Sequence, residues 1–170
     1  MRTFLISDMH FGHANIIKYE NRPFTSTEEM DNTIITNWKS IVKNKDVVLV
    51  LGDVSFYNKE KTQQIIKNLP GLKTLILGNH DRSRSSTFWR DIGFHNVYKY
   101  PIIFRDFYML SHEPLYINSS MPYINIHGHL HSNNINNNTQ QYFNTSVENI
   151  NYTPILFEDI LSKVAVSRVI

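Results

Sequence analysis

The chain has 170 residues, eight histidines and no cysteine, and its 17 basic and 15 acidic residues give a formal net charge of +2. The absence of cysteine excludes disulfides, thiolate-held metals, iron–sulfur clusters and cysteine nucleophiles. The basic residues are scattered, so they give no strong signal for nucleic-acid binding, and no apolar run is long enough to span a membrane. The apolar stretch before Asp8 is too short for a signal peptide, so we expect a cytoplasmic protein. The length fits a single domain over residues 1–170.

Strand and helix patterns alternate through the first half of the chain. Apolar, β-branched runs predict short strands, and apolar residues three or four positions apart predict helices. Ser26 to Glu29 matches the pattern of a capping box, Pro70-Gly71 is expected to stop a later helix, and Gly93 is placed to end another. The predicted elements are strands at 3–7, 47–51 and 72–77, and helices at 14–19, 27–43, 58–68 and 85–92.

The second half of the chain consists mainly of predicted strands and loops. The strands are expected at 100–104, 107–110 and 123–126, with shorter ones at 141–143 and 154–157. This order of elements predicts a layered sandwich in which the early helices pack outside a mixed sheet.

Metal-binding side chains follow five of the predicted strands. Each motif alone is weak, because polar residues after a strand usually form only a loop or turn. Ligands of open α/β sheets bind beyond the carboxyl ends of the strands, so strands that share a sheet edge would bring these groups together. In chain order the candidate ligands are Asp8 and His10, then Asp53, Asn79 and His112, and finally His129 and His131.

The types of donor predict two divalent metal ions. Carboxylate, imidazole and amide groups are hard to borderline donors, and seven of them are too many for one ion. Two ions about 3.5–4 Å apart need a shared anionic bridge, for which Asp53 is suited by its two oxygens and its place after a central strand. The other six donors divide three and three, which leaves open positions for water and substrate. We expect His129 and His131 to share one face of an extended segment.

The ordered set of motifs Asp8-x-His10, Gly52-Asp53, Gly78-Asn79-His80-Asp81, His112 and Gly128-His129-x-His131 resembles the calcineurin-like metallophosphoesterase superfamily. The resemblance spans residues 8–131. It implies an α/β/β/α four-layer sandwich, with two mixed β-sheets flanked by helices. It also implies a centre of two divalent ions, for which manganese is favoured over iron, zinc or nickel.

The resemblance further implies a role for each side chain. One ion would be held by Asp8, His10, Asp53 and His131, and the other by Asp53, Asn79, His112 and His129. His80 would be the catalytic histidine beside the substrate, which gives a proton to the leaving oxygen. The acidic residue and arginine that follow Gly-Asp in protein phosphatases are absent here, which argues against that activity. Their absence also leaves open which residue orients His80, for which Asp81 is a candidate by its proximity alone.

The implied function is a dinuclear metal-dependent phosphoesterase, with phosphodiesters favoured over phosphomonoesters. Its substrates would be small, nucleotide-like phosphate esters, attacked by a metal-activated hydroxide. Arg82, His13 and Arg22 are candidates for substrate contacts, the first for its planar fork and the others for their place in a long first loop. Two alternatives stay open, a non-catalytic interaction scaffold with this fold and a nuclease that acts on nucleic-acid ends.

Overall fold

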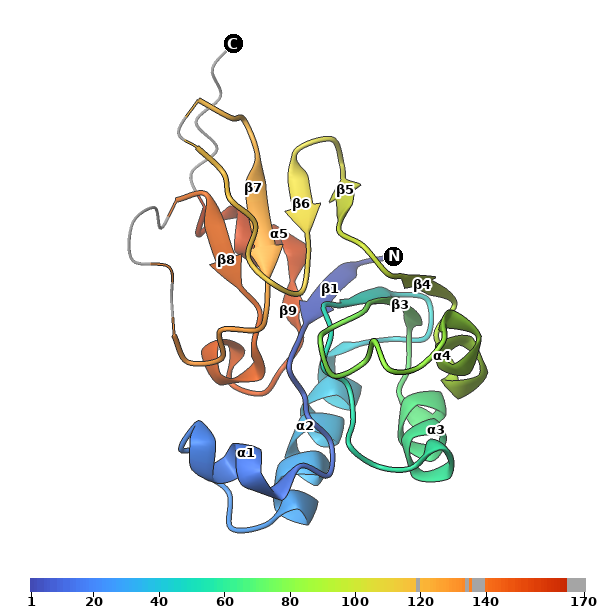
Figure 1. The fold of residues 1–170 in the computed structure, drawn as a ribbon. Coiled ribbons are helices and arrows are strands. Elements are labelled where there is room, and N and C mark those ends of the chain that lie inside the picture. Colours follow the sequence, from blue (N-terminus) through green and yellow to red (C-terminus); the bar gives the residue numbers. More distant parts are fainter. Residues whose placement is uncertain (119, 134, 136–139, 165–170) are drawn as a thin grey trace.

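The computed structural model of the chain describes residues 1–118, 120–133, 135 and 140–164. Two mixed β-sheets pack against each other and are flanked by helices (Figure 1). The first sheet has the strand order β4-β3-β2-β1-β9, and the second has the order β5-β6-β7-β8. This arrangement confirms the two mixed, helix-flanked sheets expected of the sandwich.

The first sheet is parallel except at one edge. Strands β1 to β4 run parallel, whereas β9 pairs antiparallel with β1. The carboxyl ends of β1, β2 and β3 therefore meet at one edge of the sheet. The bounds of its strands are β1 (Thr3–Ile6), β2 (Val47–Val50), β3 (Leu72–Ile76), β4 (Asn96–Tyr98) and β9 (Ile155–Leu156).

The second sheet is also mixed. Strand β5 pairs antiparallel with β6, while β6, β7 and β8 run parallel. The bounds of its strands are β5 (Ile102–Phe104), β6 (Tyr108–Leu110), β7 (Ile124–His127) and β8 (Tyr142–Asn144).

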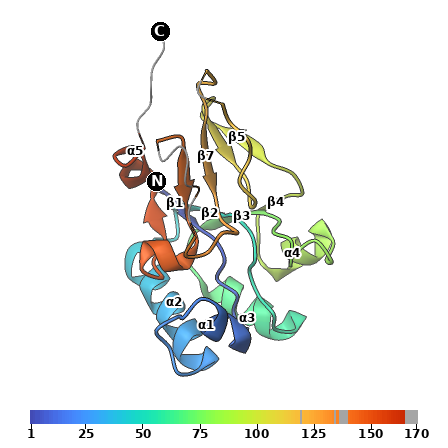
Figure 2. The same ribbon diagram turned by 60° about the vertical axis from the view of Figure 1, so that its left-hand side comes forward.

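The helices before β4 cover the face of the first sheet that points away from the second sheet, whereas the last helix packs with the second sheet (Figures 1 and 2). The Ser26 hydroxyl accepts a hydrogen bond from Glu29 N at 3.1 Å and so caps the longest helix. The Glu29 carboxylate accepts hydrogen bonds from Thr25 instead of from Ser26, so only half of the predicted capping box is present. None of the helices in the described ranges has the length and apolarity needed to cross a bilayer. The helices are α1 (Ala14–Tyr19), α2 (Thr27–Ile41), α3 (Lys59–Asn68), α4 (Ser86–Ile92), a 3₁₀ turn η1 (Val147–Ile150) and α5 (Phe157–Leu161).

The strands of the first sheet are apolar on both faces, which fits their place between two layers. Side chains such as Val48 and Val50 pack with the helix layer, where Trp38 is fully buried and donates from Nε1 to the Pro70 carbonyl at 2.9 Å. The alternate side chains, such as Leu49, belong to a second apolar cluster with β6, β7 and α5. This packing fixes the sheet edge that carries the candidate ligands.

The structure departs from the predicted elements at β4, at the end of β9, and in two elements that were not predicted, η1 and α5. Strand β4 was not predicted, because its one buried residue, Val97, stands between exposed Asn96 and Tyr98 and the strand depends on pairing with β3. The strand predicted at 154–157 is shorter, since Phe157 begins α5. The other predicted strands and helices are confirmed, with ends that differ by a few residues.

Candidate metal centre

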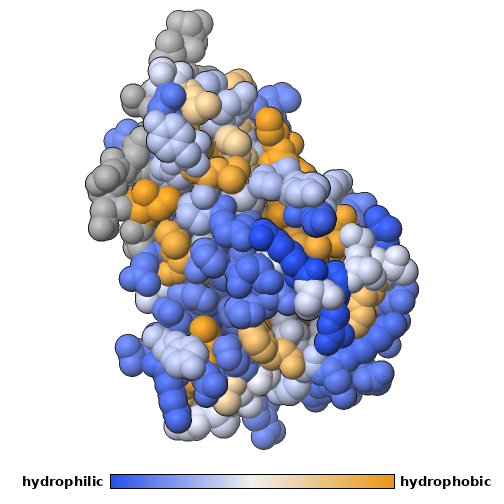
Figure 3. Space-filling model, viewed as in Figure 1, coloured by the Kyte–Doolittle hydropathy of each residue, from blue (hydrophilic) through white to orange (hydrophobic). Residues whose placement is uncertain are grey.

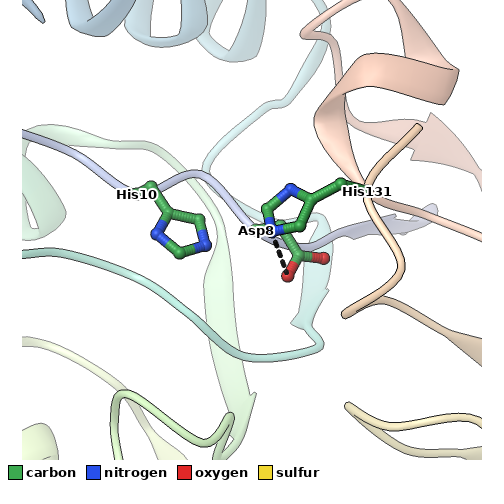
Figure 4. Close-up of side chains that lie close together, drawn as sticks. All are labelled: Asp8, His10 and His131. Atoms are coloured by element: carbon green, nitrogen blue, oxygen red, sulfur yellow. Dashed lines mark ion pairs between the residues drawn. The ribbon is translucent and has the colours of Figure 1, made fainter. Parts of the chain in front are cut away.

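The predicted ligands come together where the carboxyl ends of the first-sheet strands meet the loops after β6 and β7. Two backbone hydrogen bonds join the first two loops, from Asp8 N to Gly52 O at 3.0 Å and from His10 N to Asp53 O at 3.1 Å. Figure 4 shows Asp8 and His10, from the loop after β1, close to His131, from the loop after β7. The expected convergence of the five motifs is therefore observed.

Asp53 lies between two sets of donors. Its Oδ2 atom is 3.4 Å from His10 Nε2 and 3.6 Å from His112 Nε2, and only 3% of its side chain is exposed. Burial alone raises the pKa of this carboxyl group. Contact with His10 and the proximity of His112 have a larger, opposite effect, so the pKa is lowered to about 2. Asp53 is thus an ionised group at the middle of the cluster, where a bridging ligand would be needed.

The first set of donors contains Asp8, His10 and His131, whose ligand atoms lie within 4.8 Å of one another. One carboxylate oxygen of Asp8 accepts hydrogen bonds from His129 N at 2.9 Å and from the Ser146 hydroxyl at 2.8 Å. The other oxygen, Oδ1, is buried without a hydrogen-bond partner among the described residues, and the same holds for His10 Nε2. Buried polar atoms are rarely left unpaired, so these two atoms fit the role of ligands to a cation.

The second set contains Asn79, His112 and His129. His112 Nε2 lies 2.8 Å from Asn79 Oδ1, and His129 Nδ1 lies 3.1 Å from the same oxygen and 3.2 Å from His112 Nε2. Because His112 Nδ1 faces the Leu51 carbonyl at 2.8 Å, Nε2 is the ring nitrogen that faces the second set of donors. Ligand atoms bound to one ion at about 2.1 Å are separated by about 3 Å, so this set also fits a divalent cation.

Five of the predicted ligands have a left-handed backbone conformation, which non-glycine residues rarely adopt. Such conformations cost energy and gather at functional sites. The turn that results sends His129 toward Asn79 and His131 toward Asp8, so the expectation that both imidazoles share one face of an extended segment is wrong. The five residues are Asp8 (φ 57°), His10 (φ 51°), Asp53 (φ 55°), His129 (φ 68°) and His131 (φ 50°).

Two glycines allow the loops to approach this closely. Gly52 has φ +86°, and a Cβ atom there would lie 2.5 Å from His112 Nδ1. A Cβ atom at Gly128 would overlap the Asp8 carboxylate. The Gly-Asp and Gly-His pairs in the motifs are therefore required by the close contact between loops.

Asp81 has a different role from the one considered for it. Its carboxylate accepts backbone hydrogen bonds from Asp53 N at 2.8 Å, Val54 N at 3.1 Å and Gly78 N at 2.9 Å. It therefore joins the loops after β2 and β3 rather than orienting the ring of His80. Burial and the neighbouring Asp53 raise the pKa of Asp81 to about 6.

His80 lies at the rim of the cluster. Its side chain is 47% exposed, and its Nε2 atom is 3.9 Å from Asp53 Oδ2. Its backbone N–H donates to Asp53 Oδ1 at 3.1 Å, and its ring lies beside those of His10 and Phe56. The ring is thus next to the donors and open to solvent, as a residue that contacts substrate must be.

The three candidates for substrate contact are found in different surroundings. His13 lies beside the cluster, with Nδ1 3.4 Å from His10 Nδ1 and its ring stacked on Phe56 at 4.0 Å. Arg82 forms a 2.6 Å ion pair with Glu113 on the surface. Arg22 is buried instead of lining the rim, because its guanidinium group is held within the protein.

Arg22 and Glu148 form a buried ion pair behind the first set of donors. Arg22 Nη2 lies 2.6 Å from Glu148 Oε1 and donates to the Asp8 carbonyl at 2.8 Å, while Nη1 donates to the Met9 carbonyl at 3.1 Å. The same Glu148 oxygen is 3.0 Å from His131 Nδ1. Although burial lowers the pKa of His131, the Glu148 carboxylate outweighs it and raises that pKa. Sequence analysis missed Glu148, which stands in no motif.

Comparisons with known proteins agree with this fold. A family model described as calcineurin-like phosphoesterase matches residues 1–168. An uncharacterized protein of Methanocaldococcus jannaschii is 38% identical over a 178-position alignment that covers 99% of this chain and 94% of that protein. The gene 66 protein of Mycobacterium phage L5 is 39% identical over 82 positions, which cover 46% of this chain and 39% of that protein. The crystal structure of a protein of unknown function from Aquifex aeolicus is similar with a TM-score of 0.75 at 27% identity, and covers 94% of this chain and 97% of that one.

Proposed function

The chain belongs to the calcineurin-like phosphoesterase family, and we propose that it is a dinuclear metal-dependent phosphodiesterase acting on small nucleotide-like substrates. The observation that carries the proposal is the pair of donor sets on either side of Asp53, with two buried ligand atoms that lack a hydrogen-bond partner within the described part of the chain. One ion would be held by the first set, the other by the second, and Asp53 would bridge them. Manganese is the metal that we propose first.

Two divalent ions held in this way would activate a water molecule and bind phosphoryl oxygens. The chain supplies the remaining parts of the reaction. Glu148 holds the ring of His131 through Nδ1, which leaves Nε2 directed at Asp8 and available as a ligand. His80 gives a proton to the leaving oxygen, a role supported by its solvent-open ring at the edge of the donor cluster.

A diester is proposed over a monoester on grounds of charge. A monoester carries about one more negative charge near neutral pH and gains more from an additional arginine. The guanidinium of Arg22 is buried against Glu148, and that of Arg82 is paired with Glu113. Neither arginine offers a free fork to a second phosphoryl charge at the metal ligands.

The function is tested by metal removal and reconstitution. After treatment with a chelator, the protein is expected to hydrolyse bis-p-nitrophenyl phosphate only when Mn²⁺ is restored, and faster than p-nitrophenyl phosphate. Elemental analysis is expected to find two ions per chain. A protein that takes up no metal and shows no turnover with Mn²⁺, Zn²⁺, Ni²⁺ or Fe²⁺ would instead favour an interaction scaffold.

Metal binding is also expected to stabilise the folded chain. An ion that binds only the native state raises the free energy of unfolding by about 2.7 kcal/mol at a free concentration of 100 Kd. Thermal unfolding of the chelator-treated protein should therefore shift upward as Mn²⁺ is added. A midpoint that does not move over a range of Mn²⁺ concentrations would contradict the assigned ligands, independently of any activity.

Replacing His80 with alanine is expected to separate catalysis from metal binding. The variant should retain two metal ions, because the side chain of His80 lies outside both donor sets. General acid catalysis contributes about 10²–10⁴-fold, so hydrolysis of an alkyl phosphodiester should fall by this amount. Hydrolysis of an ester with a p-nitrophenolate leaving group should fall much less, since that group departs without a proton. Equal losses on both substrates would refute the role of proton donor.

A further inference from the structure

A small cavity lies beside His80, between the loops that follow β2 and β3 and the beginning of α4. Its volume is about 200 Å³, and its lining includes Phe56, His80, Ser83, Arg84 and Phe88. His80 is therefore shared between this cavity and the candidate metal centre, since its Nε2 atom is 3.9 Å from Asp53 Oδ2. A chemical group bound in the cavity would be adjacent to the reacting phosphate.

Arg84 differs from Arg82 in its surroundings, although the two are only two positions apart. Arg82 is neutralised by Glu113 at 2.6 Å. Arg84 is exposed and has no carboxylate partner in the described ranges, and its guanidinium carbon lies 4.7 Å from the centre of the Phe88 ring. The Phe88 backbone is anchored by the Ser85 hydroxyl, which accepts its N–H at 3.1 Å. The Arg84 guanidinium therefore stacks on an anchored ring with its charge uncompensated.

The chemistry of these side chains favours an anionic, partly aromatic ligand. A planar guanidinium presents paired N–H donors that match phosphate oxygens. Phe56, which is 42% exposed, adds an aromatic surface to the same cavity and is stacked by His13. A nucleotide has both features, since it combines a phosphate with an aromatic base.

The position of the cavity indicates which part of the substrate it would hold. In an in-line displacement the proton donor contacts the leaving oxygen, and His80 is the donor in the proposed function. The atoms attached to the leaving oxygen would therefore extend past His80, into the cavity that this residue lines.

We propose that Arg84 binds a second phosphate carried by the leaving group of the substrate, an inference that rests on the proposed function. In the reaction, the water oxygen forms a bond to the reacting phosphorus and the bond from phosphorus to the leaving oxygen breaks. One proton of the water stays on the oxygen bound to phosphorus and the other is released to solvent, while the leaving oxygen takes the proton of His80. The leaving group therefore departs as an alcohol that keeps its own phosphate. The substrate class is a nucleotide diester with a further phosphate one unit away, as in a short oligonucleotide.

The experiment compares two inhibitors of bis-p-nitrophenyl phosphate hydrolysis with Mn²⁺ present, thymidine 5′-monophosphate and thymidine 3′,5′-bisphosphate. In the wild-type protein the bisphosphate is expected to have an inhibition constant at least tenfold lower, which corresponds to about 1.4 kcal/mol. In Arg84→Ala the ratio of the two constants should fall to about one. Arg90→Ala is the matched control and should keep the wild-type ratio, because this exposed arginine of α4 does not line the cavity.

Two results would overturn the proposal while leaving the proposed function intact. The first is a wild-type protein that hydrolyses the reporter but binds both inhibitors equally well. The second is an Arg84→Ala variant that keeps the wild-type ratio. A wild-type protein without turnover of the reporter would overturn the proposed function itself, and this inference with it.

Discussion

Replacing Arg22 with methionine is expected to destabilise the folded chain by about 3–5 kcal/mol, because it leaves the Glu148 carboxylate buried without its cation. The substitution also removes the hydrogen bonds to the Asp8 and Met9 carbonyls, which hold the first loop of the site. Denaturant unfolding of the metal-free protein measures the change. A matched control is Arg82→Met, which breaks an exposed ion pair and should cost at most about 1 kcal/mol.

A double variant separates the structural role of the buried pair from its role at the metal ligands. Arg22→Met combined with Glu148→Leu removes both charges, so much of the lost stability should return. His131 would still lack its carboxylate partner, and loss of such a partner lowers metal affinity by about 10–100-fold. If the double variant regained wild-type Mn²⁺ affinity, Glu148 would have no part in positioning His131.

Replacing Asp53 with asparagine is expected to lower kcat/KM for bis-p-nitrophenyl phosphate by at least about 1,000-fold, which corresponds to about 4 kcal/mol. Asparagine keeps the size of the side chain and the acceptor for His80 N–H, but it removes the anionic charge between the two donor sets. A dinuclear centre contributes several kcal/mol of transition-state stabilisation, which depends on both ions.

Kinetics at saturating Mn²⁺ and the metal content of the purified variant test this expectation together. The variant should hold fewer than two ions per chain and keep a cooperative unfolding transition. Asp91→Asn, at an exposed aspartate of α4, is the control and should retain wild-type kinetics. If the Asp53→Asn protein held two ions and had wild-type turnover, Asp53 would not be the bridging ligand.

Much of the fold was predictable because its strands and helices have strong local patterns. The capped helix α2 and the apolar strands β1, β2 and β3 are specified by residues within each segment. Strand β4 depends on an edge of β3 that comes twenty residues earlier, so no local pattern marks it. The end of β9 at Leu156 likewise depends on the packing of Phe157 against the second sheet, which the sequence does not display.

The candidate ligands were predictable because each stands next to the end of an apolar strand. Their supporting residues were not. Asp81 stood next to a predicted catalytic histidine, which suggested that it orients His80, whereas its bonds go to backbone groups across two loops. Arg22 suggested substrate binding because it lies in a long loop, but Glu148, 126 positions away, draws it into the interior. Such contacts depend on the tertiary fold, and neither partner carries a local motif.

The parallel order of β1, β2 and β3 has a consequence for how the chain folds. Parallel neighbours are joined by long crossovers, and contacts between residues far apart in sequence form slowly. Asp8 emerges early from the ribosome, but its partner His131 follows more than 120 residues later. A nascent chain would therefore lack the complete set of candidate ligands, and the proposed ions would bind only after both sheets have assembled.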